Sequence, residues 1–174
     1  MKRRAEQSIH PPCLSGMAAR GSFHETGGLK AARSTPMNQE YQIGRQVTYL
    51  EAPDIIVMKL FGKVSQQEGS EINRRHLEMG RDADRLFYLI DMSEFEGMDP
   101  ELRKEAGLTM KTLPLRGIAV YNASLTARVV SKLIVGAMNV FKAGEEKAPF
   151  EAFPTEEEAR AWIAGRRRQL LAAA

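Results

Sequence analysis

LFYLIDMSEFEGMDPEL, residues Leu86–Leu102, is the stretch that decides the fold of this chain. Its first five residues are aromatic or aliphatic and lie between Arg85 and Asp91, which is typical of a strand that is covered on both faces. We interpret the residues after Asp91 as a turn. Asp99 and Pro100 then predict the start of a helix, because aspartate is favoured at the N-cap and proline at the first helical position.

The patterns on either side of this stretch predict further strands and helices. Alternating and continuous apolar runs predict a hairpin over residues 41–49 and 55–61, and strands over residues 86–91, 118–120 and 148–153. Helical spacing predicts helices over residues 65–81, 99–113, 125–142 and from 155 onward, and the first and last of these begin with the capping-box pairs Ser65/Glu68 and Thr155/Glu158. Strands that alternate with helices favour parallel pairing. The predicted fold class is therefore α/β, with a single mixed sheet of about five strands, an N-terminal hairpin followed by βαβ units, and four flanking helices.

Two segments of different composition divide the chain of 174 residues. Residues 1–36 hold scattered Gly, Ser, Pro and Arg with few large apolar side chains, so we expect a disordered extension. A misplaced start is the alternative explanation, since Met37 stands where the apolar pattern begins. Residues 37–174 are expected to form one domain with its own core.

The net charge of +3 comes from the N-terminal extension. The first 36 residues carry six basic and two acidic side chains, whereas the rest of the chain carries 19 basic and 20 acidic ones. A nearly neutral domain lacks the positive footprint that nucleic-acid binding requires. We therefore expect no nucleic-acid partner.

Cysteine usage and hydropathy indicate the cellular compartment of the protein. Cys13 is the only cysteine, so no disulfide can form within the chain, which suits a reducing compartment. No apolar run approaches the ~20 residues of a transmembrane helix, and the basic N-terminus is not followed by the apolar region of a secretory signal. We expect a cytoplasmic protein.

The residues that carry most enzyme chemistry are scarce after Met37. His76 is the only histidine there and cysteine is absent, so neither a Cys/His zinc site nor a Cys-His nucleophile can be assembled. His76 follows Ile72 by four residues in an amphipathic helix, where a partly buried packing residue is the simpler interpretation. No glycine pattern for nucleotide phosphates occurs. We expect no enzyme activity, no metal and no cofactor.

Three segments, taken in order, carry a resemblance to a known family. They are DMSEFEGMD (residues 91–99), AVYNASLTARVVSKLIVGAMNVFKAG (residues 119–144) and FPTEEEARAW (residues 153–162). The first is similar to the D-[LM]-S-x-[FV]-x-x-M-D segment of STAS-type anti-sigma-factor antagonists. Residues 37–171 together resemble the SpoIIAA-like branch of the STAS and CRAL-TRIO-like group. The resemblance implies a small bacterial domain without catalysis that regulates a protein partner or holds an apolar ligand.

The chain departs from the resembled family at the phosphorylation site. The resemblance implies a serine or threonine directly after the 91–99 segment, where this chain has Pro100, Glu101 and Leu102. The family's phosphorylation switch is therefore not expected here. Ser93 remains as a hydroxyl in a turn, and Asp99 as either a helix cap or a permanent negative charge.

Two functional hypotheses remain open after this comparison. The first is a regulatory domain that docks a protein partner or a second copy of itself, and the second is a carrier or sensor of a small, lipid-like apolar ligand. Helix 125–142 is apolar on more of its circumference than one packed face requires, which suits either hypothesis. The candidate residues for partner or ligand binding are Ser93, Asp99, Asn122, Ser124, Val135 and Met138.

Overall fold

The structure, a computed structural model, describes residues 39–139 and 148–173. All of them lie in one compact unit that spans residues 33–174. Six strands and four helices follow one another along the chain: β1 (Tyr41–Ile43), β2 (Gln46–Glu51), β3 (Ile55–Val64), α1 (Gln66–Met79), β4 (Leu86–Met98), α2 (Pro100–Thr112), β5 (Leu115–Tyr121), α3 (Leu125–Asn139), β6 (Phe150–Phe153) and α4 (Glu156–Ala172). The expectations for residues 1–36 and for the end of the third helix beyond residue 139 lie outside the described residues.

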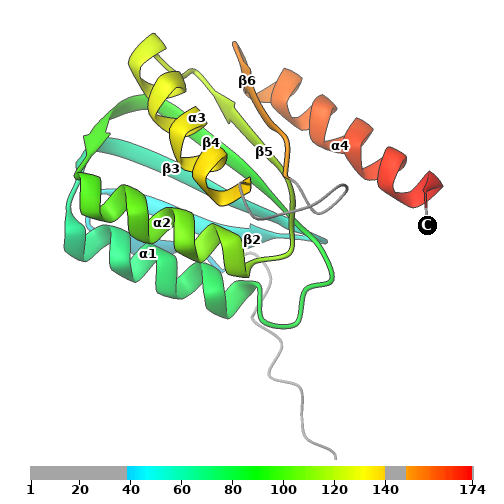
Figure 1. The fold of residues 1–174 in the computed structure, drawn as a ribbon, viewed down its shortest axis with the longest axis horizontal. Helices are drawn as coiled ribbons and strands as arrows, with labels where there is room; N and C mark the ends of the chain where they lie inside the picture. The colour runs from blue at the N-terminus through cyan, green and yellow to red at the C-terminus, as the bar shows by residue number, and fades with distance from the viewer. Residues whose placement is uncertain (1–38, 140–147, 174) are drawn as a thin grey trace, which may run out of the picture. The chain divides into compact units, whose positions relative to one another are not determined.

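A single six-stranded sheet organises the unit (Figure 1). Its strands lie in sequence order, with antiparallel pairing from β1 to β3 and parallel pairing from β3 to β6. Each pair of neighbouring parallel strands is connected by a helix, because parallel strands need a crossover connection. The predicted fold class, a mixed α/β sheet with an N-terminal hairpin and four helices, is confirmed, with one strand more than expected.

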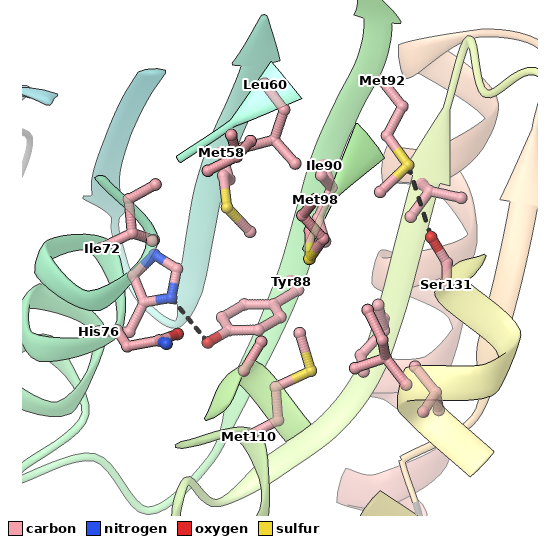
Figure 2. A pocket seen from close by; sticks show the side chains of 18 of the residues that line it. Met58, Leu60, Ile72, His76, Tyr88, Ile90, Met92, Met98, Met110 and Ser131 are labelled. Carbon is pink, nitrogen blue, oxygen red and sulfur yellow. Dashed lines mark hydrogen bonds between the residues drawn. The ribbon is translucent and has the colours of Figure 1, made fainter. Parts of the chain in front are cut away.

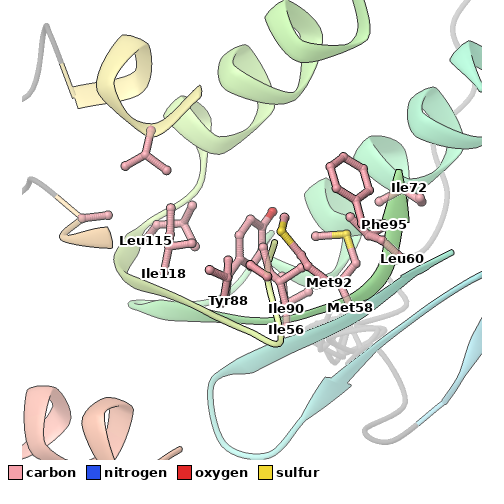
Figure 3. Close-up of a cluster of buried hydrophobic side chains, with 14 of the residues drawn as sticks. Ile56, Met58, Leu60, Ile72, Tyr88, Ile90, Met92, Phe95, Leu115 and Ile118 are labelled. Atoms are coloured by element: carbon pink, nitrogen blue, oxygen red, sulfur yellow. The ribbon is translucent and has the colours of Figure 1, made fainter. Parts of the chain in front are cut away.

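The two faces of the sheet bury separate apolar clusters. Helices α1, α2 and α3 cover one face and α4 covers the other (Figure 1). Along β4, side chains alternate between the two clusters, so Tyr88 and Ile90 enter the larger one while Phe87 and Leu89 pack under α4. Figure 3 shows the larger cluster, where side chains of the central strands meet Ile72 of α1. This burial on both faces explains why the 86–90 run contains no charged residue.

The caps predicted at two helix starts differ in how complete they are. Ser65 and Glu68 form a full capping box, in which the Ser65 hydroxyl accepts from the Glu68 N–H and the Glu68 carboxylate accepts from the Ser65 N–H. At α4, the Thr155 hydroxyl accepts from the Glu158 N–H. Satisfying these N–H groups stabilises each helix by about 1 kcal/mol.

One expectation for the 86–102 stretch is wrong, and a second is confirmed in position but not in its hydrogen bond. The residues after Asp91 do not form a turn, because β4 continues to Met98 and keeps pairing with β3 through two register shifts. Met92 and Phe95 are buried in this extension. Asp99 stands at the N-cap of α2, but its carboxylate makes no capping hydrogen bond. It forms an ion pair with Lys63 instead, with 2.8 Å between Oδ1 and Nζ.

The first predicted strand is also two strands rather than one. Gly44 has a φ of 59°, a conformation that glycine adopts without strain, and here the chain turns between β1 and β2. The rest of the hairpin, β2 with β3, is as predicted.

A buried carboxylate holds α4 against the sheet. Asp54 is 4% exposed and accepts a hydrogen bond from Arg85 Nε at 2.9 Å and another from Arg167. Arg167 is the middle residue of the triplet Arg166–Arg168 in the C-terminal half of α4, and the structure gives it Asp54 as a specific ionic partner. Because a buried charge is costly unless it is paired, this contact positions the C-terminal half of α4.

We expect Asp54→Asn to lower the free energy of unfolding by about 3 kcal/mol, the lower end of the range for breaking a buried ion pair. Asp99→Asn is the matched control, because Asp99 and Lys63 are both well exposed and such pairs contribute under about 1 kcal/mol. Urea unfolding of the two variants measures the difference. Equal losses would show that Asp54 does not hold α4 as described.

Candidate functional site

A partly open cavity lies between the sheet and helices α1, α2 and α3 (Figure 2). About 60 Å³ of it is open to the centre of a water-sized sphere, several times the ~10–15 Å³ that one water molecule needs. Its wall is almost entirely apolar and includes four methionines, Met58, Met92, Met98 and Met110. Methionine side chains are flexible and adapt to partners of irregular shape. The cavity is therefore the candidate site.

A chain of hydrogen bonds forms the polar end of the cavity. The two ring nitrogens of His76 are both used: Nδ1 lies 2.9 Å from the Tyr88 hydroxyl and Nε2 lies 3.0 Å from the Thr48 hydroxyl. The Thr48 hydroxyl in turn donates to the carbonyl oxygen of Val57 at 2.9 Å. The chain thus joins α1 to strands β2, β3 and β4.

The direction of every hydrogen bond in this series follows from the bond between Thr48 and Val57. Thr48 has one hydroxyl hydrogen, and because it goes to Val57, the Thr48 oxygen accepts from His76 Nε2–H. A neutral imidazole carries its proton on one nitrogen only, so Nδ1 accepts from the Tyr88 hydroxyl. His76 therefore donates at Nε2 and accepts at Nδ1.

Burial keeps the members of this hydrogen-bond chain uncharged. His76 is 2% exposed, and removal from water lowers its pKa to about 3 because the imidazolium form loses its hydration. Burial also raises the pKa of Tyr88 well above its usual value. Both groups stay neutral around pH 7, so they serve as hydrogen-bonding groups and not as charges.

Among the described residues that line the cavity, Asn73 has a buried side-chain donor that no partner uses. Its side chain is buried, the residue being 8% exposed, and its Nδ2 has no hydrogen-bond partner. Leaving a buried donor unsatisfied costs about 1–3 kcal/mol. At another place in the wall, the Ser131 hydroxyl donates to the sulfur of Met92 at 3.5 Å (Figure 2). Asn73 is thus the polar group free to meet a bound molecule.

Among the residues that the sequence singles out, Val135 reaches the cavity. It is 5% exposed and lines the wall together with Ile134 and Ser131 of the same helix. It therefore belongs to the cavity wall and not to the exposed surface of α3. Met138 lies one turn further along α3, and its side chain is outside what the structure describes.

The other four predicted residues lie on the surface, away from the cavity wall. The Ser93 N–H donates to the Asp91 carboxylate, and Asp99 pairs with Lys63. Asn122 is exposed with a φ of 54°, and the Ser124 hydroxyl caps α3 by accepting from the Ala127 N–H. The structure gives each of these residues a local role and does not gather them into one site.

Sequence reasoning missed the residues at the polar end of the cavity. It treats His76 as a packing residue and does not single out Asn73, Tyr88 or Thr48. One signal was available: Asn73 and His76 stand on the same helical face as the buried Ile72. Polar residues within the inward stripe of an amphipathic helix indicate buried hydrogen bonds.

The described residues offer no assembled metal centre and no membrane span. In residues 39–139 and 148–173, no three His, Cys, Asp or Glu side chains come close enough to hold a metal ion. Within the same ranges, none of the helices combines the length and the apolar character that crossing a bilayer requires.

The architecture defines a class of small α/β domains with a mixed sheet, three helices on one face and one on the other. The family model described as SpoIIAA-like matches residues 55–164, well over half of the chain. The chain therefore belongs to the SpoIIAA-like family.

Solved structures are similar to this chain at low sequence identity. An uncharacterized protein of the DUF3478 family with a SpoIIAA-like fold, from Shewanella loihica PV-4, matches with 18% identity and a TM-score of 0.47, over 74% of this chain and 98% of its own. The anti-sigma factor antagonist SpoIIAA in its unphosphorylated form matches with 18% identity and a TM-score of 0.45, over 68% of this chain and 96% of its own. Among curated proteins, none matches the chain.

The buried neutral His76 predicts how stability depends on pH. The folded state keeps His76 unprotonated down to pH about 3, whereas the unfolded chain protonates it near pH ~6.5. Between these values the unfolded state binds the extra proton, so the free energy of unfolding decreases as the pH falls. From pH ~6.5 to pH ~4.5 we expect a loss of about 2 kcal/mol from this group.

His76→Gln is the control for this pH dependence, because glutamine is neutral throughout and retains hydrogen-bonding groups. Urea unfolding of both proteins at several pH values in that window gives the two slopes. The wild-type slope should be the steeper one, and identical slopes would contradict a buried neutral His76.

Proposed function

We propose that this chain is a non-catalytic domain that binds a small apolar ligand in the cavity under α1, α2 and α3, as a carrier or sensor. The single observation that supports this proposal is the cavity itself, which has an apolar wall and one unpartnered donor, Asn73 Nδ2. Ligand sites in proteins are commonly apolar pockets with a few well-placed polar groups.

The size of the cavity limits the ligand. Its 60 Å³ is less than the ~150 Å³ of an engineered apolar cavity that binds benzene. A molecule of that size or larger requires the methionines of the wall to change rotamer. Met58, Met92, Met98 and Met110 come from two strands and one helix, so the wall can give way on several sides.

The chemistry of the cavity supports binding without catalysis. A general base works best when its pKa lies near the pH of the reaction, and the pKa of His76 is about 3. Both of its nitrogens are also engaged by Thr48 and Tyr88. These hydrogen bonds hold the wall in place and leave His76 no free nitrogen for a substrate.

A second candidate function is regulation through a protein partner. Leu125, Val129 and Leu133 follow one another at intervals of four along α3 and are 81%, 60% and 63% exposed. We call these three residues the outer stripe. Adjacent exposed apolar side chains on one helix face mark interaction surfaces. Asn122 and Ser124 directly precede the stripe and are included in this proposed surface, while Ser93 and Asp99 stay predicted contacts of a partner.

Filling the cavity should displace a ligand. We expect native mass spectrometry of the full chain, purified gently from its own host, to show a releasable small apolar mass on the wild type. Val135→Phe places a larger side chain in the cavity and should remove that mass. Leu133→Phe makes the same kind of change on the outer stripe and should retain it, with circular dichroism confirming that both variants fold. A wild type without any bound mass would argue against the carrier function.

Charging the outer stripe tests the second function. Val129→Glu combined with Leu133→Glu should leave the fold intact, because both side chains are mostly exposed. The same variant should lose a second copy or a protein that co-purifies with the wild type, as seen by native mass spectrometry. Val135→Phe, which acts inside, should retain that partner. A charged stripe with unchanged association would count against docking at α3.

A further inference from the structure

The chemical class of the ligand follows from counting hydrogens at the polar end of the cavity. The proton of Tyr88 goes to His76, that of His76 goes to Thr48, and that of Thr48 goes to Val57. None of these protons is available to a ligand. Asn73 Nδ2 carries two hydrogens and has no partner among the described residues.

Charged ligands do not fit this wall. The described residues that line the cavity include no Lys, Arg, Asp or Glu, and burial keeps His76 neutral. A carboxylate or an ammonium group would therefore enter without an opposite charge. Burying an unpaired charge costs far more than one hydrogen bond to an amide returns.

We propose that the ligand is a small, uncharged, apolar molecule with a carbonyl, ether or hydroxyl oxygen that accepts a hydrogen bond from Asn73 Nδ2. This inference rests on the proposed ligand-binding function and specifies it. The oxygen lies at the α1 end of the cavity, beside the His76–Tyr88 pair, and the hydrocarbon part lies among the methionines. Asn73 thereby becomes the residue that selects an oxygenated ligand over a hydrocarbon.

The geometry of α1 supports a recognition role for Asn73. It stands between Gly69 and His76 on the inward face of the helix, and all three line the cavity. His76 is fixed by two hydrogen bonds, which fixes this part of α1 against the sheet. The helix backbone that carries Asn73 is therefore held in place, which lowers the entropy cost of presenting its amide to a ligand.

Cyclopentane and cyclopentanone are the probes that test the proposal, because they share one ring and differ in one acceptor oxygen. The full chain is labelled with ¹³C at its methionine methyl groups, and each probe is titrated into it. Shifts of Met58, Met92, Met98 and Met110 report binding in the cavity, while Met79, buried but outside the cavity wall, is the internal control.

Asn73→Leu removes the donor at similar size. We expect it to weaken cyclopentanone binding about tenfold, as the loss of one buried hydrogen bond predicts, and to leave cyclopentane binding unweakened. Ser131→Ala is the matched control, since the Ser131 hydroxyl already bonds to Met92, and it should leave the ratio of the two affinities unchanged.

The infrared carbonyl band of bound cyclopentanone gives a second readout that needs no variant. We expect this band at lower frequency in the wild-type protein than in cyclohexane, because a hydrogen bond weakens the C=O bond.

Three outcomes would overturn the proposal in distinguishable ways. If neither probe shifts the cavity methionines, ligand binding itself fails, and the inference with it. If Asn73→Leu changes both affinities alike, the cavity binds apolar molecules but Asn73 does not select oxygen. A carbonyl band at its cyclohexane position in the bound state leads to the same conclusion, as expected where a buried water molecule holds the Asn73 amide.

Discussion

The hydrogen-bond chain from Tyr88 through His76 and Thr48 to Val57 is the constraint on which the rest of the structure depends. It connects one helix to three strands inside an otherwise apolar cluster. Each member would be costly to bury alone, and each is satisfied only when the other elements are in place. The chain therefore fixes the position of α1 relative to the sheet more specifically than apolar contacts do.

The same series of hydrogen bonds determines what the cavity can recognise. Burial keeps the His76–Tyr88 end of the cavity electrically neutral. Each proton of the hydrogen-bond chain is donated to the next member, and the last to a backbone carbonyl, so none is left for a ligand. Asn73, on the helix that the chain fixes, keeps an unused donor within a wall that is otherwise satisfied. A site of this kind would select ligands by shape and by one hydrogen bond, as the proposed ligand-binding function requires.

The two functional hypotheses concern opposite sides of helix α3. Its inner side contributes Ser131, Ile134 and Val135 to the cavity, and its outer side exposes Leu125, Val129 and Leu133. The excess of apolar residues in the sequence therefore has two separate causes, and a single explanation for it would be wrong. A bound molecule and a docked partner would contact opposite sides of one helix, so the two functions are compatible.

The sequence predicts the parts of this structure that depend on local pattern. The 86–90 run, the Ser65/Glu68 box and the order of strands and helices are readable because apolar periodicity and caps act within a few residues. The extension of β4 to Met98 was not predicted, since it depends on pairing with a long β3 across register shifts. The Asp54–Arg167 contact joins residues 113 positions apart and leaves no local signature.

The cavity was beyond sequence analysis for a further reason. This cavity is space left between side chains of seven different elements, and its volume depends on how closely those elements approach. Gly69 illustrates this point: a Cβ at this position would lie 2.2 Å from Leu102 Cδ1, so the glycine lets α2 approach α1 at that place. Whether space remains a few ångströms away depends on the rotamers of Met98 and Met110, which no pattern specifies. What the sequence does contain is the pair Asn73 and His76 on the buried face of α1. Because buried polar residues need hydrogen-bond partners, polar residues in an otherwise apolar stripe indicate a candidate site even where the cavity itself cannot be predicted.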